Sequence, residues 1–432
     1  MLRKEHEALE IKGKRSVRRG LALLLAATLL CAGCSQTSAD VQEDAGTGFT
    51  AEPEGQSSNE TAEETENPWD ALKELTLDTS PLEQPLELPS DSTVYSAALA
   101  LQAQTLCAAQ GREEQQAMLE ACGFTLLRQV NFDKDSDSPA HSCAYSIARR
   151  EIALDGEIRT LLAVVIRGTA GGEWYSNFDF APSQRDDAVF AENFLLAAEE
   201  VVLEVQTVLA QEASPPLVLL CGHSRGAACA NLAGLLLNAA YDARNVYAYT
   251  FASPGTIRSD GDADSDNVLG IPCRNIFNVI NAADIVPMTP LEGWGYFRAG
   301  TDVVLCGDEE KAAARRDAMQ TLLEIAPSVQ RYYSDRHALD GAGLSENGVT
   351  AFELMLTLAQ SLSGVSDAEG ARQESQELRL DALSEESDFA PLFDLLERCA
   401  EQDGALGADI VRQHMPAVYQ ALLEKAEPEG EQ

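Results

Sequence analysis

Apolar and polar positions fall into short blocks along most of the chain, and the period of these blocks changes repeatedly from two to about three and a half residues. Apolar-rich runs at 143–153 and 158–166 flank Asp155-Gly156, a dipeptide typical of tight hairpin turns. Farther on, apolar runs of strand length precede longer segments with helical spacing. This pattern predicts strands at 216–221, 246–251, 276–280 and 297–305, and helices at 92–110, 113–122, 189–210, 225–241, 309–330, 348–363 and 416–425.

The alternation of strands and helices between residues 158 and 305 indicates the fold class. Parallel strands joined by helices form sheets whose two faces are both covered, so their strands are almost entirely apolar. We therefore expect an α/β chain with a mostly parallel central sheet and helices on both faces.

The N-terminal 33 residues have the pattern of an export signal. A basic stretch precedes the apolar run Leu21–Leu30, which is too short to span a bilayer. Cys31-Ala32-Gly33 followed by Cys34 resembles a bacterial lipobox. We expect Cys34 to be the lipid-modified N-terminus, with the protein exported and anchored to the membrane on the extracytoplasmic face of the cell envelope. A plain secretory signal cleaved nearby is the alternative.

Composition divides the remainder of the chain. Residues 34–68 are acidic and poor in large apolar residues, so we expect a disordered linker. We expect residues 69–432 to form one folded domain, with a helical insertion around 309–400 that includes the acidic stretch 364–388. The formal charge of −39 disfavours nucleic acid as a partner. Neither the oligomeric state nor any disulfide follows from the sequence.

Gly222-His223-Ser224-Arg225-Gly226 is the strongest local signal. An apolar strand precedes it and an apolar helix follows it, which is the setting of the nucleophile elbow in α/β-hydrolases. The two glycines give clearance where strand and helix approach, and the helix dipole favours negative charge developing near the serine. We therefore predict an α/β-hydrolase fold with Ser224 as the nucleophile, and we expect His223 to be structural.

A serine nucleophile needs a base, an acid and an oxyanion hole. In α/β-hydrolases the chain order is Ser, Asp, His, which leaves His337 and His414 as candidate bases. Asp284 follows the predicted strand 276–280 and is the best candidate for the acid. The backbone N–H groups of Thr169 and Arg225 are the candidate oxyanion donors.

Several segments of the chain, taken in order, resemble those of a known family. They are Arg167-Gly168-Thr169, Trp174 with Asp179, Gly222–Ala227, Phe251–Gly255, and Asn281 with Asp284, Val286 and Pro287. Together they resemble the class 3 lipases of the fungal type over roughly residues 140–300. The resemblance implies triad and oxyanion roles for Ser224, Asp284, Thr169 and Arg225.

The resemblance also bears on the base, because His414 with Tyr419 is similar to the His-x-x-x-x-Tyr ending of bacterial members. Pro416 suits the first turn of a helix, which would leave His414 on the preceding loop. We therefore favour His414, although His337 lies at the usual family interval from the acid. Arg225 stands where the family has Leu, which suggests a more polar pocket, and residues 180–188 form a short, polar lid region.

The sequence as a whole predicts a serine carboxylic ester hydrolase of the triacylglycerol lipase type. Its substrate would be a lipid or a small ester, and neither a metal nor an organic cofactor is expected. A phospholipase-type acyl hydrolase acting on envelope lipids is the first alternative. The second is a catalytically silent surface lipoprotein that only binds ligands.

Overall fold

The computed structural model describes residues 72, 74–132, 142–169, 182–185, 188–259, 263–290, 295–316, 409 and 411–426. The expected export signal, Cys34, the linker, His337 and most of the 309–400 insertion lie outside these residues, as do Trp174 and Asp179. None of the described helices has the length and apolar character needed to cross a membrane.

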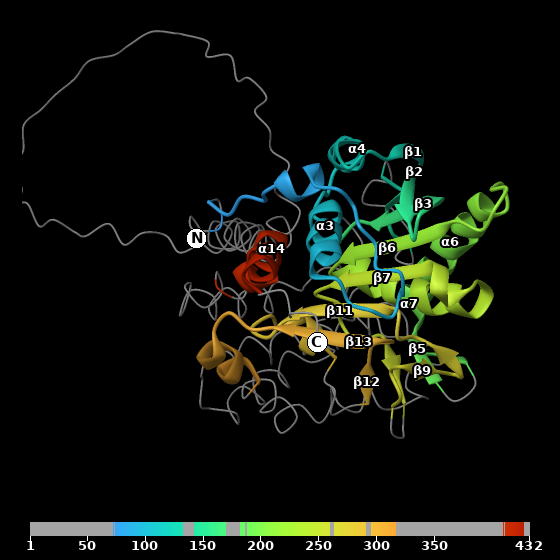
Figure 1. Cartoon of the computed structure of the whole chain (residues 1–432). Coiled ribbons are helices and arrows are strands. Elements are labelled where there is room, and N and C mark those ends of the chain that lie inside the picture. The colour runs from blue at the N-terminus through green and yellow to red at the C-terminus, as the bar shows by residue number, and fades with distance from the viewer. Residues whose placement is uncertain are drawn as a thin grey trace, which may run out of the picture.

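A seven-stranded sheet crosses the middle of the molecule in the order β1-β2-β3-β6-β7-β11-β13 (Figure 1). β1, β2 and β3 are antiparallel neighbours, and every pairing from β3 to β13 is parallel. Asp155 and Gly156 join β2 to β3 with φ angles of 52° and 81°, the conformation that a two-residue hairpin of this type requires. The strands are β1 (Thr125–Val130), β2 (Tyr145–Leu154), β3 (Glu157–Ile166), β6 (Leu217–His223), β7 (Val246–Phe251), β11 (Ile276–Asn281) and β13 (Thr301–Leu305).

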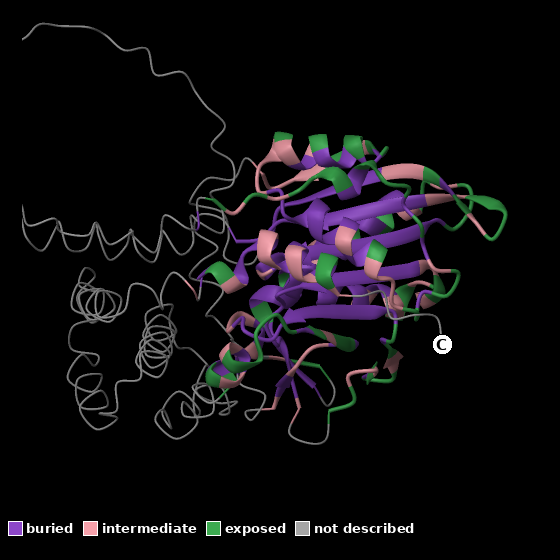
Figure 2. Ribbon diagram, turned by 60° about the vertical axis from the view of Figure 1, so that its left-hand side comes forward, coloured by how far each residue is buried: buried purple, intermediate pink, exposed green. Residues whose placement is uncertain are grey.

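Helices cover both faces of this sheet, and its central strands are buried (Figure 2). Successive residues of a strand point to opposite faces. Val164 therefore packs in the core formed with α6 and α7, whereas Val165 packs in the core formed with α3, α4 and α14. The helices are α3 (Ala97–Cys107), α4 (Arg112–Ala121), α6 (Glu192–Leu209), α7 (Arg225–Ala240) and α14 (Pro416–Lys425), with short 3₁₀ turns η2 (Ser80–Glu83), η3 (Ala243–Asn245) and η4 (Val286–Met288).

A second sheet, in the order β12-β8-β5-β4, and the hairpin β9–β10 were not predicted. The helix expected from residue 189 begins at Glu192, because residues 188–191 pair with two other strands as β5. The strand expected at 297–305 is divided, since Phe297 lies in the second sheet and residues 301–305 lie in the central one, with 298–300 in neither. The bounds are β4 (Pro182–Arg185), β5 (Ala188–Ala191), β8 (Ile257–Arg258), β9 (Asn267–Val268), β10 (Ile271–Pro272) and β12 (Tyr296–Phe297).

The turn between β6 and α7 is packed so tightly that its glycines are required. A methyl group on Gly226 would lie 2.4 Å from Ile166 O and 2.6 Å from Arg167 O. On Gly222, a methyl group would lie 2.2 Å from Gly226 O. The first turn of α7 therefore rests directly on the end of β3. With its mostly parallel sheet and two helical layers, the molecule has the predicted α/β-hydrolase fold.

This contact generates a prediction for Gly226→Ala. The added methyl group meets backbone carbonyls, which cannot rotate away as a side chain would, so the free energy of unfolding should fall by about 3 kcal/mol or more. Gly111→Ala is a matched control, because a methyl group there lies 3.8 Å from its nearest neighbour, Glu114 Cβ. Urea denaturation measures both variants, and equal unfolding midpoints would contradict the steric argument.

Candidate active site

Ser224 lies at the turn between β6 and α7, in a backbone conformation that side-chain-bearing residues rarely adopt. Its φ and ψ angles are 57° and −122°. The surrounding backbone holds it there: the Ser224 N–H donates to Phe251 O at 2.9 Å, and Ser224 O accepts from Ala227 N at 2.9 Å. Strain of this kind persists only where neighbouring contacts fix the conformation, and it concentrates at functional sites.

His414 connects Ser224 to Asp284. Its Nε2 lies 2.9 Å from Ser224 Oγ, and its Nδ1 lies 2.8 Å from Asp284 Oδ2. The three side chains come from distant parts of the sequence, since 190 positions separate Ser224 from His414. The imidazole is 8% exposed and the carboxylate is completely buried. Of the two candidate bases, His414 is the one that the described residues bring to Ser224.

Asp284 follows β11, and its carboxylate is surrounded by donors. Oδ1 accepts from Val286 N at 3.0 Å, and Oδ2 accepts from the Tyr419 hydroxyl at 2.8 Å as well as facing His414. A buried carboxylate is tolerated only where hydrogen bonds replace its lost hydration. Burial raises the pKa of Tyr419, and the Asp284 charge raises it further, so this hydroxyl stays protonated and remains a donor.

Asn281, the last residue of β11, joins the segment that carries Asp284 to the one that carries His414. Its Oδ1 accepts from Ala283 N at 3.1 Å. Its Nδ2 donates to both Gln413 O and Gln413 Oε1, at 2.9 Å and 3.0 Å. One side chain therefore fixes the residues immediately preceding the acid and the histidine.

His223 is a buried neighbour of this group. Its ring centroid lies 5.0 Å from that of His414 and 5.6 Å from that of Tyr419. Burial lowers its pKa well below the ordinary value, and the proximity of His414 lowers it further. The ring is therefore neutral and packs against the His414 ring.

The segments that carry the two predicted oxyanion donors lie side by side. Residues 166–168 lie against the turn at 222–226, and a methyl group on Gly168 would lie 3.4 Å from His223 O. Thr169, which is 6% exposed, ends this segment. Arg225 is the first residue of α7, so its N–H lies at the positive end of the helix dipole.

The Arg225 side chain corrects the expectation of a more polar pocket. It is 2% exposed, with its guanidinium carbon 5.1 Å from the centroid of the Phe194 ring in α6. Its Nη2 donates to Ser142 O at 3.1 Å. The charge therefore lies in the interior between α6 and α7. Within the predicted lid region 180–188, the described residues 182–185 form β4 and pair with β5.

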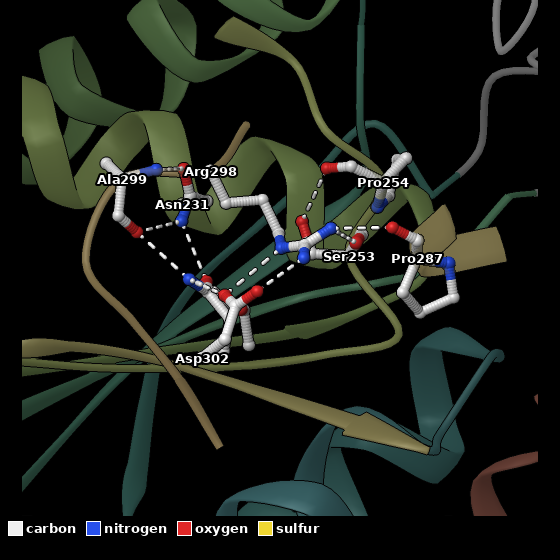
Figure 3. A network of polar contacts seen from close by, with 9 residues as sticks. Asn231, Ser253, Pro254, Pro287, Arg298, Ala299 and Asp302 are labelled. Atoms are coloured by element: carbon white, nitrogen blue, oxygen red, sulfur yellow. Dashed lines mark hydrogen bonds and ion pairs between the residues drawn. The ribbon is translucent and has the colours of Figure 1, made fainter. Parts of the chain in front are cut away.

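A polar network holds the loops that follow β7 and β11 (Figure 3). Arg298 Nη1 donates to Ser253 O at 3.1 Å and to Pro287 O at 2.7 Å. The same guanidinium forms an ion pair with Asp302 at 2.5 Å. Asn231 of α7 extends the network by donating to Ala299 O at 2.7 Å. The loop that carries Asp284 is thus fixed to the core through Pro287 O.

Sequence reasoning assigned no role to three polar side chains of this site, although it quoted two of them in motifs. Tyr419 and Asn281 were noted without a function, and Arg298 was not singled out. Such contacts have no periodic signal, because each joins residues far apart in the chain. The nearest available signal for Tyr419 was its spacing from His414.

Part of the chain matches a known protein family. Residues 163–294 match the family described as lipase (class 3). Among curated proteins, none matches the chain.

Solved structures of fungal lipases are also similar. The triacylglyceride lipase of Rhizomucor miehei is 21% identical, with 48% of this chain and 78% of that chain covered and a TM-score of 0.37. The lipase of Rhizopus microsporus var. chinensis is 22% identical, with 53% and 82% covered and a TM-score of 0.38. A lipase of Yarrowia lipolytica is 17% identical, with 43% and 68% covered and a TM-score of 0.32.

The family match covers β6, α7 and the loop that carries Asp284, but it does not extend to the segment that carries His414. This chain, part of which matches the class 3 lipase family, is a carboxylic ester hydrolase with an α/β-hydrolase fold.

Proposed function

We propose that this hydrolase cleaves acylglycerol-type esters through an acyl-enzyme formed on Ser224. The observation that carries the proposal is the pair of hydrogen bonds that link Ser224 Oγ to the His414 imidazole and the imidazole to Asp284. A serine hydroxyl becomes a nucleophile when an oriented imidazole can take its proton.

Acylation begins with attack by Ser224 Oγ on the ester carbonyl carbon. His414 Nε2, 2.9 Å away, takes the hydroxyl proton during the attack. The resulting imidazolium is stabilised by Asp284, whose Oδ2 lies 2.8 Å from His414 Nδ1. When the tetrahedral intermediate collapses, the same Nε2 donates its proton to the leaving alcohol. The acyl group remains on Ser224.

The negative charge on the carbonyl oxygen needs donors that are already in place. The backbone N–H groups of Thr169 and Arg225 are the proposed donors. Two observations support this assignment. Residues 166–168 pack closely against the turn at 222–226, and the helix dipole at the start of α7 favours negative charge.

Deacylation reverses these proton transfers with water in place of the alcohol. His414 removes a proton from the water as the water attacks the acyl carbon, and then returns it to Ser224 Oγ. The products are a carboxylic acid and the free enzyme, and every step uses groups of this chain.

Tyr419 is proposed to assist by fixing the acid. Its hydroxyl and Val286 N donate to different oxygens of the Asp284 carboxylate, which leaves Oδ2 facing His414. Carboxylate and imidazole then keep the orientation in which Nδ1 is protonated and Nε2 is free to act as a base.

Replacement of Ser224 or His414 by alanine tests the mechanism. Each variant should lose roughly 10⁴-fold or more in kcat on p-nitrophenyl esters, because the nucleophile and its base act as a unit. Ser224→Ala should also abolish labelling by a fluorophosphonate probe. His337→Ala is the control and should retain the parent rate. Loss of activity in His337→Ala but not in His414→Ala would reject the assigned base.

Tyr419→Phe tests the role of the hydroxyl. Removing a donor to a buried charge should lower the free energy of unfolding by about 2 kcal/mol. The kcat should also fall on the order of 10-fold, because Asp284 loses its orientation. Tyr247→Phe is a matched control, because Tyr247 is also buried and its hydroxyl donates to a backbone acceptor, Pro89 O, at 2.8 Å. Thermal melts and steady-state kinetics compare the two variants. An equal kcat in both would leave Tyr419 with only a structural role.

The acyl-chain profile tests the substrate class. If the enzyme acts on lipid esters, kcat/KM should rise along p-nitrophenyl acetate, butyrate, octanoate and decanoate, because each buried methylene contributes about 0.8 kcal/mol. Spectrophotometric assays of the purified protein measure the series below the aggregation concentration of each ester. A maximum at acetate would instead assign the enzyme to small soluble esters.

A further inference from the structure

The described chain reaches His414 only after a long interval that follows the central sheet. β13 ends at Leu305, and residues 309–316 then form helical turns, drawn in orange below the red α14 in Figure 1. The next described residue is Asp409, five positions before His414. The backbone of the central sheet therefore does not by itself determine where the imidazole lies.

Asp409 forms ion pairs with two cations from the helical turns at 309–316. Its Oδ1 lies 2.6 Å from Lys311 Nζ, and its Oδ2 lies 3.0 Å from Arg315 Nη2. Each carboxylate oxygen thus has its own cation. The contact with Lys311 joins positions 98 residues apart.

This ion-pair cluster is not an ordinary surface contact. The side chain of Asp409 is 21% exposed and that of Arg315 is 7% exposed. Exposed pairs contribute little because water screens them, whereas partly buried pairs with separate partners for each oxygen hold a fixed geometry. Burial raises the pKa of Asp409, but hydrogen bonds from Lys311 and Gln413 and the two nearby charges outweigh it, leaving the pKa below its ordinary value.

The side chain of Gln413 connects Asp409 to Asn281, near the acid of the site, through hydrogen bonds. Gln413 Nε2 donates to Asp409 Oδ1 at 3.2 Å. The oxygens of Gln413 in turn accept from Asn281 Nδ2, and Asn281 is three positions before Asp284. The ion pairs therefore fix one end of the segment at 409–414, and Asn281 fixes the other end beside the acid.

We propose that Asp409 is a positioning residue that holds the His414 imidazole within reach of Ser224, by fixing residues 409–414 to Lys311 and Arg315. The inference rests on the proposed function, in which His414 is the base. Its physical basis is the steep dependence of proton transfer on distance, since a misplacement of about 1 Å can lower turnover on the order of 100-fold.

Steady-state kinetics of Asp409→Asn in the full chain test this role. Asparagine keeps the size of the side chain but removes the charge that holds Lys311 and Arg315. We expect kcat and the fluorophosphonate labelling rate to fall in parallel by roughly 10- to 100-fold, with KM within about twofold of the parent. Asp409→Glu should recover part of the rate. Lys311→Met, which leaves Arg315 paired, should give an intermediate loss.

Glu204→Gln is the matched control, because Glu204 is 28% exposed and its Oε1 pairs with Arg128 Nε at 2.6 Å between α6 and β1. Its kcat should equal that of the parent, and melting temperatures show how far each variant is destabilised. An unchanged kcat in Asp409→Asn would overturn the inference, as would a loss that Asp409→Glu does not relieve. His414→Ala separates the two proposals, because full activity in that variant would reject the base itself.

Discussion

The tight contact between the start of α7 and the end of β3 is the constraint on which the site depends. Gly226 lies against Ile166 O and Arg167 O with no space for a methyl group. This contact brings the opening turn of the helix beside the segment that ends in Thr169. It also requires the chain to reverse within one residue, which gives Ser224 its positive φ. The position of the Ser224 hydroxyl and that of the adjacent N–H groups are therefore consequences of one packing arrangement.

The parallel sheet explains why the other parts meet there. Loops that follow parallel strands gather at the carboxyl edge of the sheet, which is where ligands bind in such folds. Ser224 follows β6, Asp284 follows β11 and Thr169 follows β3, so the sheet order alone places them at one edge. In the part of the chain that the structure describes, no strand leads to His414. Its position comes from side-chain contacts, chiefly those of Asn281 with Gln413 and of Asp409 with its two cations.

Buried and partly buried polar side chains perform much of this positioning. Arg298 fixes the loops after β7 and β11 through two backbone carbonyls. Arg225 places its charge against Phe194 and Ser142 O within the core. His223 remains neutral because it is buried, which avoids a second positive charge beside the imidazolium that the proposed mechanism forms.

The sequence by itself determined the features that repeat or that are local. Strand and helix periods predicted a mostly parallel α/β sheet. The glycines around Ser224 predicted the turn, and with it the α/β-hydrolase fold, because steric requirements act on adjacent residues. It also placed Asp284 after a strand. The tertiary structure decided that His414 lies beside Ser224, that the Arg225 side chain points into the core, and that residues 188–191 form a strand. Those outcomes depend on contacts between residues far apart in the chain, and such contacts leave no periodic pattern in the sequence.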